Sequence, residues 1–111
     1  MTILEIFEKV NLKVPIEQRR FFNYFEDTVN ELQTLYSGFV FVKDAEYQPP
    51  KTLSDENVVM PLYASAIVDN IIFLASGEEN YKSEFIRKSR DAWLKYWNDN
   101  AKGRRLRSVR W

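Results

Sequence analysis

The sequence contains no cysteine and no histidine. Without cysteine, the chain cannot form a disulfide, a thiolate metal site or a cysteine nucleophile. Without histidine, it lacks the most common general base and the most common transition-metal ligand of proteins. A nucleophile in this chain could be paired only with a lysine or a carboxylate, so few residues are available for catalysis.

Glycine and long apolar runs are also scarce. The three glycines, Gly38, Gly77 and Gly103, are scattered, so the sequence has no glycine-rich phosphate-binding loop. No apolar run approaches the roughly 20 residues that span a bilayer. The N-terminal stretch MTILEIFEKV has acids among its apolar residues and no basic n-region, so it does not resemble a signal peptide. We expect a soluble, intracellular protein with no membrane contact.

Carboxylates are numerous, but their positions do not favour catalysis or metal binding. Glu78-Glu79 and Asp55-Glu56 stand at predicted helix starts, where the helix dipole accounts for them. Residues 44–57 lack the spaced Asp/Asn residues and the central glycine of a calcium loop. We therefore expect a protein that is not an enzyme and has no catalytic residues, no cofactor and no metal.

The chain has the length of one domain and enough apolar residues to fold. Its 111 residues are 45% hydrophobic and 15% aromatic, more than a disordered chain contains. Three Trp, six Tyr and eight Phe are many for this length. Because aromatic side chains give a large contact area at low entropic cost, we expect some of them to serve an interface as well as the core.

The N-terminal region predicts a short helix and the start of a longer one. Thr2 and Glu5 have the spacing of a capping box, so a helix is expected at 2–10. A break is expected at 11–14, and Pro15 suits the first position of a second helix.

The second helix is expected over 15–36, with a stop at Ser37-Gly38. FVFV at 39–42 is too short for a helix and is rich in residues favoured in strands. Residues 43–57 contain Pro49-Pro50 and four acids and form a long loop, and loops of this length are usually functional or disordered. The apolar residues of the second helix step by three and four in a heptad-like stripe: Phe22, Phe25, Val29, Leu32 and Tyr36.

The C-terminal half predicts two more helices. The third begins at 59–61, ends at 76–77 and is apolar all round, which predicts the buried centre of a bundle. Asp69-Asn70 interrupt it and are expected to make local or interhelical hydrogen bonds. The fourth is expected from 78 to 102, ended by Gly103. Its acid-to-base pairs at i,i+4 are Glu78/Lys82, Glu84/Lys88 and Asp91/Lys95.

The predicted fold class is therefore all-α. It is a small antiparallel helical bundle of about four helices, with one short extended segment and a long loop between helices 2 and 3. The predicted organisation is a helical domain at 1–103 followed by a basic C-terminal docking arm at 104–111.

The last ten residues, KGRRLRSVRW, hold five basic side chains and no acidic one. The chain has 16 basic and 16 acidic residues in total, so residues 1–101 hold 11 basic and 16 acidic residues, a net charge of −5. A solvated terminus is one interpretation. However, such a terminus has no use for a tryptophan, and residues 104–111 could reach about 27 Å if extended, enough to lie in a partner's groove or join its sheet. The candidate partner-binding residues are Arg104, Arg105, Leu106, Arg107, Val109, Arg110 and Trp111.

Two classes of partner fit a basic arm. Arginine pairs bidentately with carboxylates, which favours an acidic protein surface, although phosphate also fits. A nucleic-acid binder normally spreads its positive charge over a folded face, whereas the body of this chain is acidic and would repel DNA beyond the arm. We therefore predict a protein partner. The opposite charges of body and arm also permit head-to-tail contacts between identical subunits.

Residues 35–97 read LYSGFVFVKDAEYQPPKTLSDENVVMPLYASAIVDNIIFLASGEENYKSEFIRKSRDAWLKYW. This stretch is similar to small helical head–tail connector proteins (adaptor or head-completion proteins) of long-tailed bacteriophages and prophages. The resemblance covers roughly residues 16–111. It depends on size, helix order, the acidic proline-containing excursion before the apolar third helix, and the basic C-terminal arm.

The resemblance implies a structural subunit of a homo-oligomeric ring of about twelve copies. The ring would lie in the neck of the virion, under the portal protein, after assembly in the host cytoplasm. Residues 104–111 would be the portal-docking arm, and loop 43–57 would face the neighbouring neck or tail-completion protein or line the channel. An acidic channel would let double-stranded DNA pass without specific binding. Whether the isolated chain is a monomer stays open.

The alternative is a small nucleic-acid-binding accessory protein that uses the same arm. A small regulatory helical protein has no sequence feature in its favour.

Overall fold

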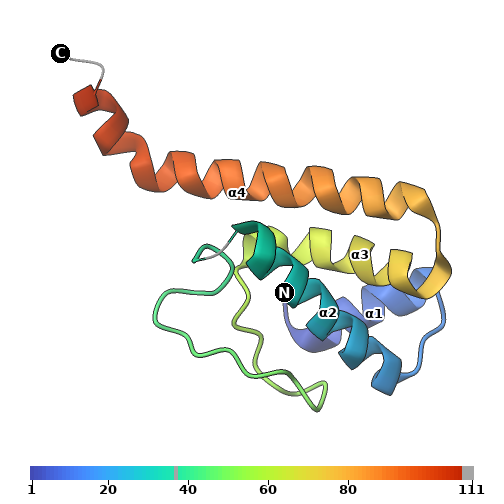
Figure 1. The fold of residues 1–111 in the computed structure, drawn as a ribbon. Coiled ribbons are helices and arrows are strands. Elements are labelled where there is room, and N and C mark those ends of the chain that lie inside the picture. The colour runs from blue at the N-terminus through green and yellow to red at the C-terminus, as the bar shows by residue number, and fades with distance from the viewer. Residues whose placement is uncertain (37, 109–111) are drawn as a thin grey trace.

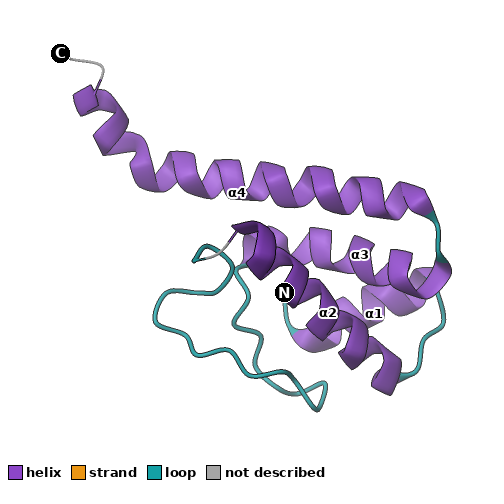
Figure 2. Ribbon diagram, viewed as in Figure 1, coloured by secondary structure: helices purple, strands orange, loops and turns teal. Residues whose placement is uncertain are grey.

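The computed structural model of the protein describes residues 1–36 and 38–108, with side chains as far as Asn98. These residues form four α-helices and one 3-10 helix, and no strand lies within them. Figures 1 and 2 show a small helical bundle with one long excursion, so the predicted all-α fold class is confirmed. The elements are α1 (Ile3–Lys13), α2 (Gln18–Tyr36), η1 (Pro61–Tyr63), α3 (Ala64–Ser76) and α4 (Glu79–Ser108).

The central helix is α3, which packs against α1, α2 and α4. In Figure 1, α4 runs along the upper side of α3, while α1 and α2 lie below it. The sequence prediction that the third helix is the buried centre of the bundle is confirmed. Eight of the 13 residues of α3 are buried: Ala64, Ala66, Ile67, Val68, Asp69, Asn70, Ile71 and Ile72.

The hydrophobic core takes side chains from every element. Ile6 of α1, Phe25 of α2, Tyr63 of η1, Ile67 of α3 and Phe85 of α4 each have 0% of their surface exposed. Fully burying one aliphatic or phenylalanine side chain contributes about 1.5–3 kcal/mol. The bundle is therefore stabilised from residues spread along the whole length of the chain, from the first helix to the last.

The start of α1 has the predicted capping box. The N–H of Glu5 donates to the Thr2 hydroxyl at 3.1 Å, and the N–H of Thr2 donates to the Glu5 carboxylate at 3.3 Å. These two bonds occupy donors that have no partner within the helix itself.

The boundary between α1 and α2 differs from the prediction. The break expected at 11–14 is wrong for most of its length, because α1 continues through it, and α2 begins at Gln18 rather than at Pro15. The Asn11 side-chain oxygen accepts the N–H of Ile16 at 3.1 Å. This bond holds the backbone after the proline in a non-helical conformation and delays the start of α2.

Two glycines end helices, as the sequence predicted. Gly38 follows the last residue of α2, Tyr36, with a φ of 85°, and Gly77 follows α3 with a φ of 77°. The N–H of Gly77 donates to the carbonyl of Phe73 at 2.7 Å. Glycine adopts this left-handed conformation without a Cβ clash. Ser37, the other half of the first predicted stop, lies outside the described residues.

The extended segment expected at 39–42 is confirmed as a single antiparallel bridge. Phe41 pairs with Val59, and the N–H of Met60 donates to the carbonyl of Val40 at 2.8 Å. The bridge closes the two ends of the long connection between α2 and η1, so the excursion leaves and returns to the body at one place.

The loop at 43–57 contains no helix or strand, as predicted, and Figure 2 shows it on the side of the body away from α4. The backbone N–H groups of Lys51 and Thr52 donate to Asp55 at 2.7 and 3.0 Å, and these bonds lower the pKa of the Asp55 carboxyl. Burial raises the pKa of Tyr47 to about 12. The loop is therefore held both by hydrogen bonds within it and by packing of Tyr47 and Leu53 against the core.

Candidate partner-binding helix

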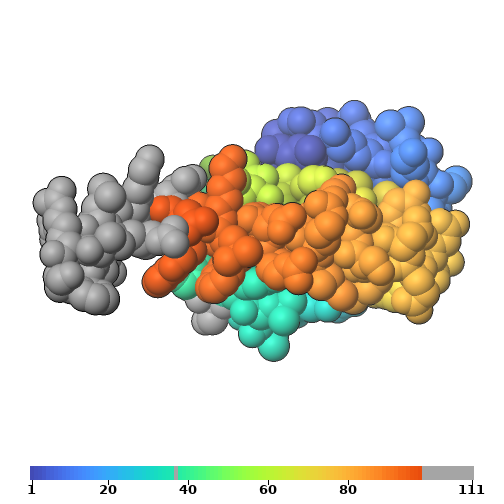
Figure 3. Space-filling model, turned by 90° about the horizontal axis from the view of Figure 1, so that it is seen from above, coloured from blue at the N-terminus to red at the C-terminus, as the bar shows by residue number. Residues whose placement is uncertain are grey.

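The first residues of the predicted docking arm, 104–108, belong to α4, so the packing of this helix fixes where the arm begins. Phe85, Ser89 and Ala92 are buried, and their spacing of four and three residues puts them on one face of the helix, against α3. Figure 3 shows α4 lying across the face of the molecule with its outer side uncovered. In Figure 1 its C-terminal turns extend beyond the other three helices.

Lys82 ties α4 to both α2 and α3. Its ammonium lies 2.6 Å from the carboxylate of Glu31 and donates to the side-chain oxygen of Asn70 at 3.2 Å. The Asn70 amide in turn donates to the hydroxyl of Thr28 at 2.8 Å. Asn70 and Thr28 are fully buried, so this network satisfies polar groups that water cannot reach.

Lys88 forms a second link to α3, six residues further along α4. Its ammonium lies 2.6 Å from the carboxylate of Asp69 and donates to the hydroxyl of Ser65 at 2.9 Å. Asp69 is 8% exposed, so its charge needs this partner. The interhelical hydrogen bonding predicted for Asp69-Asn70 is confirmed at Asn70, whereas Asp69 makes an interhelical ion pair.

The i,i+4 ion pairs predicted within α4 are wrong. Lys82 and Lys88 lie on the flanks that face α2 and α3, so each pairs with a carboxylate of another helix. Arg87 instead binds Glu84 at 2.6 Å and Asp91 at 3.4 Å on the exposed side of α4. The hydrogen bond from Arg87 lowers the pKa of Glu84. The spacing of residues along one helix does not predict the partners of Lys82 and Lys88. These partners depend on which flank of α4 packs against a neighbouring helix.

A chain of aromatic rings fixes the part of α4 that lies beyond the lysine ties. Tyr36 stacks on Tyr63 with ring centres 6.0 Å apart and on Trp93 at 5.8 Å. Trp93 stacks on Trp97 at 6.4 Å, and Phe39 and Trp97 meet in a T-shaped contact with ring centres 5.9 Å apart. The rings lead from the buried core to the surface of α4. Burial raises the pKa of Tyr63 to about 12.

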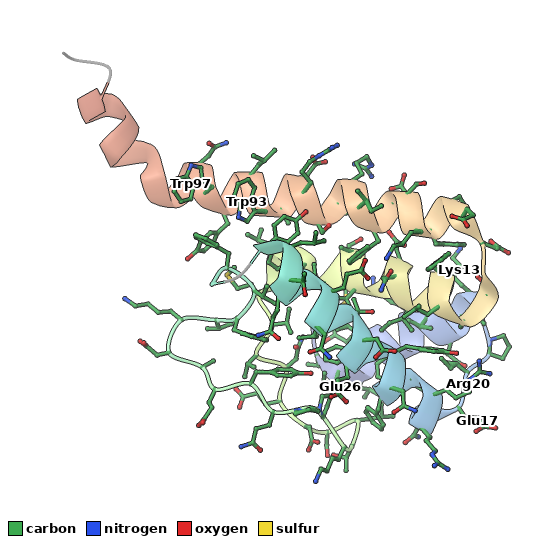
Figure 4. All side chains as sticks on the ribbon, in the orientation of Figure 1. Lys13, Glu17, Arg20, Glu26, Trp93 and Trp97 are labelled. Carbon is green, nitrogen blue, oxygen red and sulfur yellow. The ribbon has the colours of Figure 1, made fainter. Side chains whose placement is uncertain are left out.

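One flank of α4 carries an apolar line that the bundle only partly covers. Ile86 is 50% exposed and Trp97 is 45% exposed, with Trp93 half-buried between them. Arg90 lies in the same line, is exposed, and has no ion pair among the described residues. Figure 4 labels Trp93 and Trp97 on neighbouring turns of α4. We call Ile86, Arg90, Trp93 and Trp97 the α4 stripe.

The sequence did not single out the α4 stripe as a surface. Arg90 was the one feature of the sequence that could have indicated that this line is exposed, because an arginine among apolar residues is rarely buried.

The predicted arm residues fall into two groups. Arg104, Arg105, Leu106 and Arg107 lie in the last turns of α4. Val109, Arg110 and Trp111 lie outside the described residues.

The helix end predicted at Gly103 is wrong, because α4 is continuous from Glu79 to Ser108. A single glycine costs a helix about 1 kcal/mol, which a helix of this length absorbs. The start of the arm, at 104–108, is therefore helical rather than extended. Its role in binding stays a prediction.

Other candidate sites are weaker. Within the described residues, no group of three or more acidic side chains could hold a metal ion. None of the described helices has the length and apolarity that a membrane crossing requires. A shallow groove of about 370 Å³ on the long loop is lined by Glu46, Gln48, Pro49, Pro50, Lys51, Asp55, Glu56 and Val58.

Comparison with known proteins gives no match: no protein-family model, no curated protein and no solved structure matches this chain. A function must therefore be inferred from the residues of this chain and from the geometry of α4.

Proposed function

We propose that this protein is a non-enzymatic assembly subunit that docks onto a partner protein through the C-terminal end of α4. One observation carries the proposal. Among the described residues, the buried side chains of α4 end at Ala92 and its ring contacts end at Trp97. The helix nevertheless continues to Ser108, and its cluster of basic residues begins at Lys102. The basic segment therefore follows, on the same helix, the residues whose described contacts fix α4 to the bundle.

The attachment of α4 supports the same proposal. Lys82 and Lys88 bind carboxylates of α2 and α3, and the aromatic rings fix the helix as far as Trp97. A docking element that continues a fixed helix loses less conformational entropy on binding than a free tail. Arginines at its end suit an acidic surface, because guanidinium groups pair bidentately with carboxylates.

The resemblance of residues 16–111 to phage head–tail connector proteins gives the proposal its specific form. The partner is then a portal protein, with a neighbouring neck or tail-completion protein on the other side. The subunit forms a homo-oligomeric ring in the neck of the virion, assembled in the host cytoplasm, and double-stranded DNA passes through its lumen. Large portal-sized and capsid-sized reading frames just upstream of this gene would support this form.

Truncation tests the proposal. A chain ending at Gly103 keeps every described buried residue, so we expect it to fold with an unchanged urea midpoint and to lose binding to the portal ring in a sedimentation assay. A matched control replaces Lys9 and Lys13, which are exposed on α1, with glutamate and should still bind. Equal binding of the full-length and truncated chains would show that the arm is not the docking element.

The arginines also fit the alternative, a nucleic-acid-binding accessory protein. Titration with random-sequence duplex DNA at several salt concentrations separates the two functions. Counterion release makes phosphate binding fall steeply with salt. The full-length chain would then bind duplex DNA at micromolar concentration with a steep dependence on salt, and the chain ending at Gly103 would not bind. This result would favour the nucleic-acid-binding function over the assembly function.

A further inference from the structure

The α4 stripe lies on the same helix as the first residues of the basic arm. Trp93 and Trp97 help to fix α4, yet Ile86, Arg90 and Trp97 of the stripe are exposed. We infer that the stripe is a docking surface for an acidic amphipathic helix of the partner protein. This inference rests on the proposed function, because it takes the stripe and the arm to meet the same partner, and it adds the chemistry of that partner.

The spacing of the stripe favours a helix as the occupant. Ile86, Arg90, Trp93 and Trp97 step by four, three and four residues, which keeps them on one line along α4. This is the spacing of the seam on which a second helix packs in a coiled coil or a helix-in-groove complex. An extended peptide would match such a line poorly, because its side chains repeat every two residues.

The stripe is open and already fixed in shape. Ile86 and Trp97 are each about half exposed, as quantified above, while Trp93 is held between Tyr36 and Trp97 by ring stacking. Tryptophan and arginine are the residues most enriched among binding hot spots. Because the indoles are held in place before binding, little side-chain entropy is lost when a partner covers them.

The neighbouring helix α2 widens the apolar surface. Glu31 of α2 reaches across to Lys82 of α4, so the flank of α2 that carries Glu31 faces α4. Leu35 lies one turn after Glu31 on that flank and is 53% exposed. Leu35 therefore adds one exposed apolar side chain on the flank of α2 that faces α4.

The charge of the surface selects an acidic occupant. Arg90 is exposed in the middle of the stripe without an ion pair among the described residues, and the stripe itself contains no acid. The same helix continues into the basic segment that begins at Lys102. A second copy pairing stripe to stripe would bring these like charges together, which opposes a symmetric dimer.

The probe for this inference is a pair of synthetic helical peptides of about 28 residues, four heptads long. Both have leucine at the a and d positions; one has glutamate and the other lysine at the e and g positions. Calorimetric titration of the full-length protein should give micromolar binding of the glutamate peptide and none of the lysine peptide.

Two matched variants locate the contact. Arg90→Glu and Lys95→Glu make the same charge change on the same helix, but Lys95 lies off the stripe. We expect Arg90→Glu to weaken the glutamate peptide about tenfold or more and Lys95→Glu to change it less than about twofold. Both positions are exposed, so both variants should keep the wild-type urea midpoint.

Three results would overturn the inference. These are no binding of the glutamate peptide by the wild-type protein, equal weakening by the two variants, and concentration-dependent self-association that Arg90→Glu abolishes. The chain ending at Gly103 keeps the stripe, so its portal binding judges the proposed function separately. If truncation abolishes portal binding but the glutamate peptide does not bind the wild-type protein, the proposed function is supported and the inference about the α4 stripe is wrong.

Discussion

Helices α3 and α4 lie side by side and differ in almost every respect. α3 is 13 residues long, has eight buried residues and carries one charge, that of Asp69. α4 is 30 residues long and presents Ile86, Leu94 and Trp97 at the surface. The contrast shows that α3 supplies much of the core that α4 packs against, whereas α4 leaves large apolar side chains exposed. We propose that this exposed side of α4 serves recognition.

The largest expected effect separates two isoleucines, one on each helix. Ile71 of α3 has 0% of its surface exposed, whereas Ile86 of α4 is 50% exposed. Ile71→Ala removes buried methyl groups and leaves a cavity, so we expect it to lower the free energy of unfolding by about 2–5 kcal/mol. Ile86→Ala should change it by less than about 0.5 kcal/mol. Urea denaturation measures both, and similar losses would contradict the division between the helices.

The next effect concerns two cations on α4 itself. Lys88→Met leaves the carboxylate of Asp69, 8% exposed, without its partner. Because the lysine side chain is about one third exposed, we expect a loss of about 1–3 kcal/mol, less than for a fully buried pair. Arg87→Met removes only exposed ion pairs, which solvent screens, so we expect a smaller loss of stability than for Lys88→Met. A larger loss for Arg87→Met would mean that the outer side of α4 holds the bundle together.

The smallest effect at neutral pH is expected at Tyr63, where the aromatic chain enters the core. Its buried hydroxyl has no hydrogen-bond partner among the described residues, so Tyr63→Phe should be neutral or slightly stabilising at pH 7. Burial raises the Tyr63 pKa from 10.0 to about 12. Between these values the unfolded chain releases the proton while the folded protein keeps it, so wild-type stability falls as pH rises.

Comparing the two proteins isolates that contribution. Relative to Tyr63→Phe, the wild-type free energy of unfolding should be constant below pH 10 and then fall by up to about 1.4 kcal/mol per pH unit. Urea denaturation from pH 8 to 11.5 provides the curve. Parallel curves for the two proteins across this range would show that the hydroxyl is solvated in the folded state.

Local patterns in the sequence predicted much of the fold. The capping box at Thr2, the stops at Gly38 and Gly77 and the buried third helix all depend on residues close together in the chain, and all are confirmed. The pairing of Lys82 and Lys88 was wrong because their partners, on α2 and α3, are distant in sequence. The spacing of residues predicts which side chains of one helix can pair with each other. It does not predict which flank of that helix packs against another helix, because that depends on the folded bundle.

The candidate site was predicted less completely than the fold. The basic arm was evident from charge alone, but its helical start was not. A glycine near the end of a helical pattern usually ends the helix, whereas Gly103 lies within α4. The α4 stripe was missed because exposed and buried tryptophans look alike in a sequence. Only the packing of Phe39 and Tyr36 against one side of these rings decides how much of each indole is left open.

The near-parallel rings on α4 also give the protein a built-in spectroscopic reporter. Trp93 lies 16° from the plane of Trp97 and 24° from that of Tyr36. Chromophores this close together couple their electronic transitions, so the near-ultraviolet circular dichroism of the folded protein should carry a signal from this end of the helix. Any event that tilts or lifts α4 from α2 would change that spectrum without a label, even where the rest of the bundle stays intact.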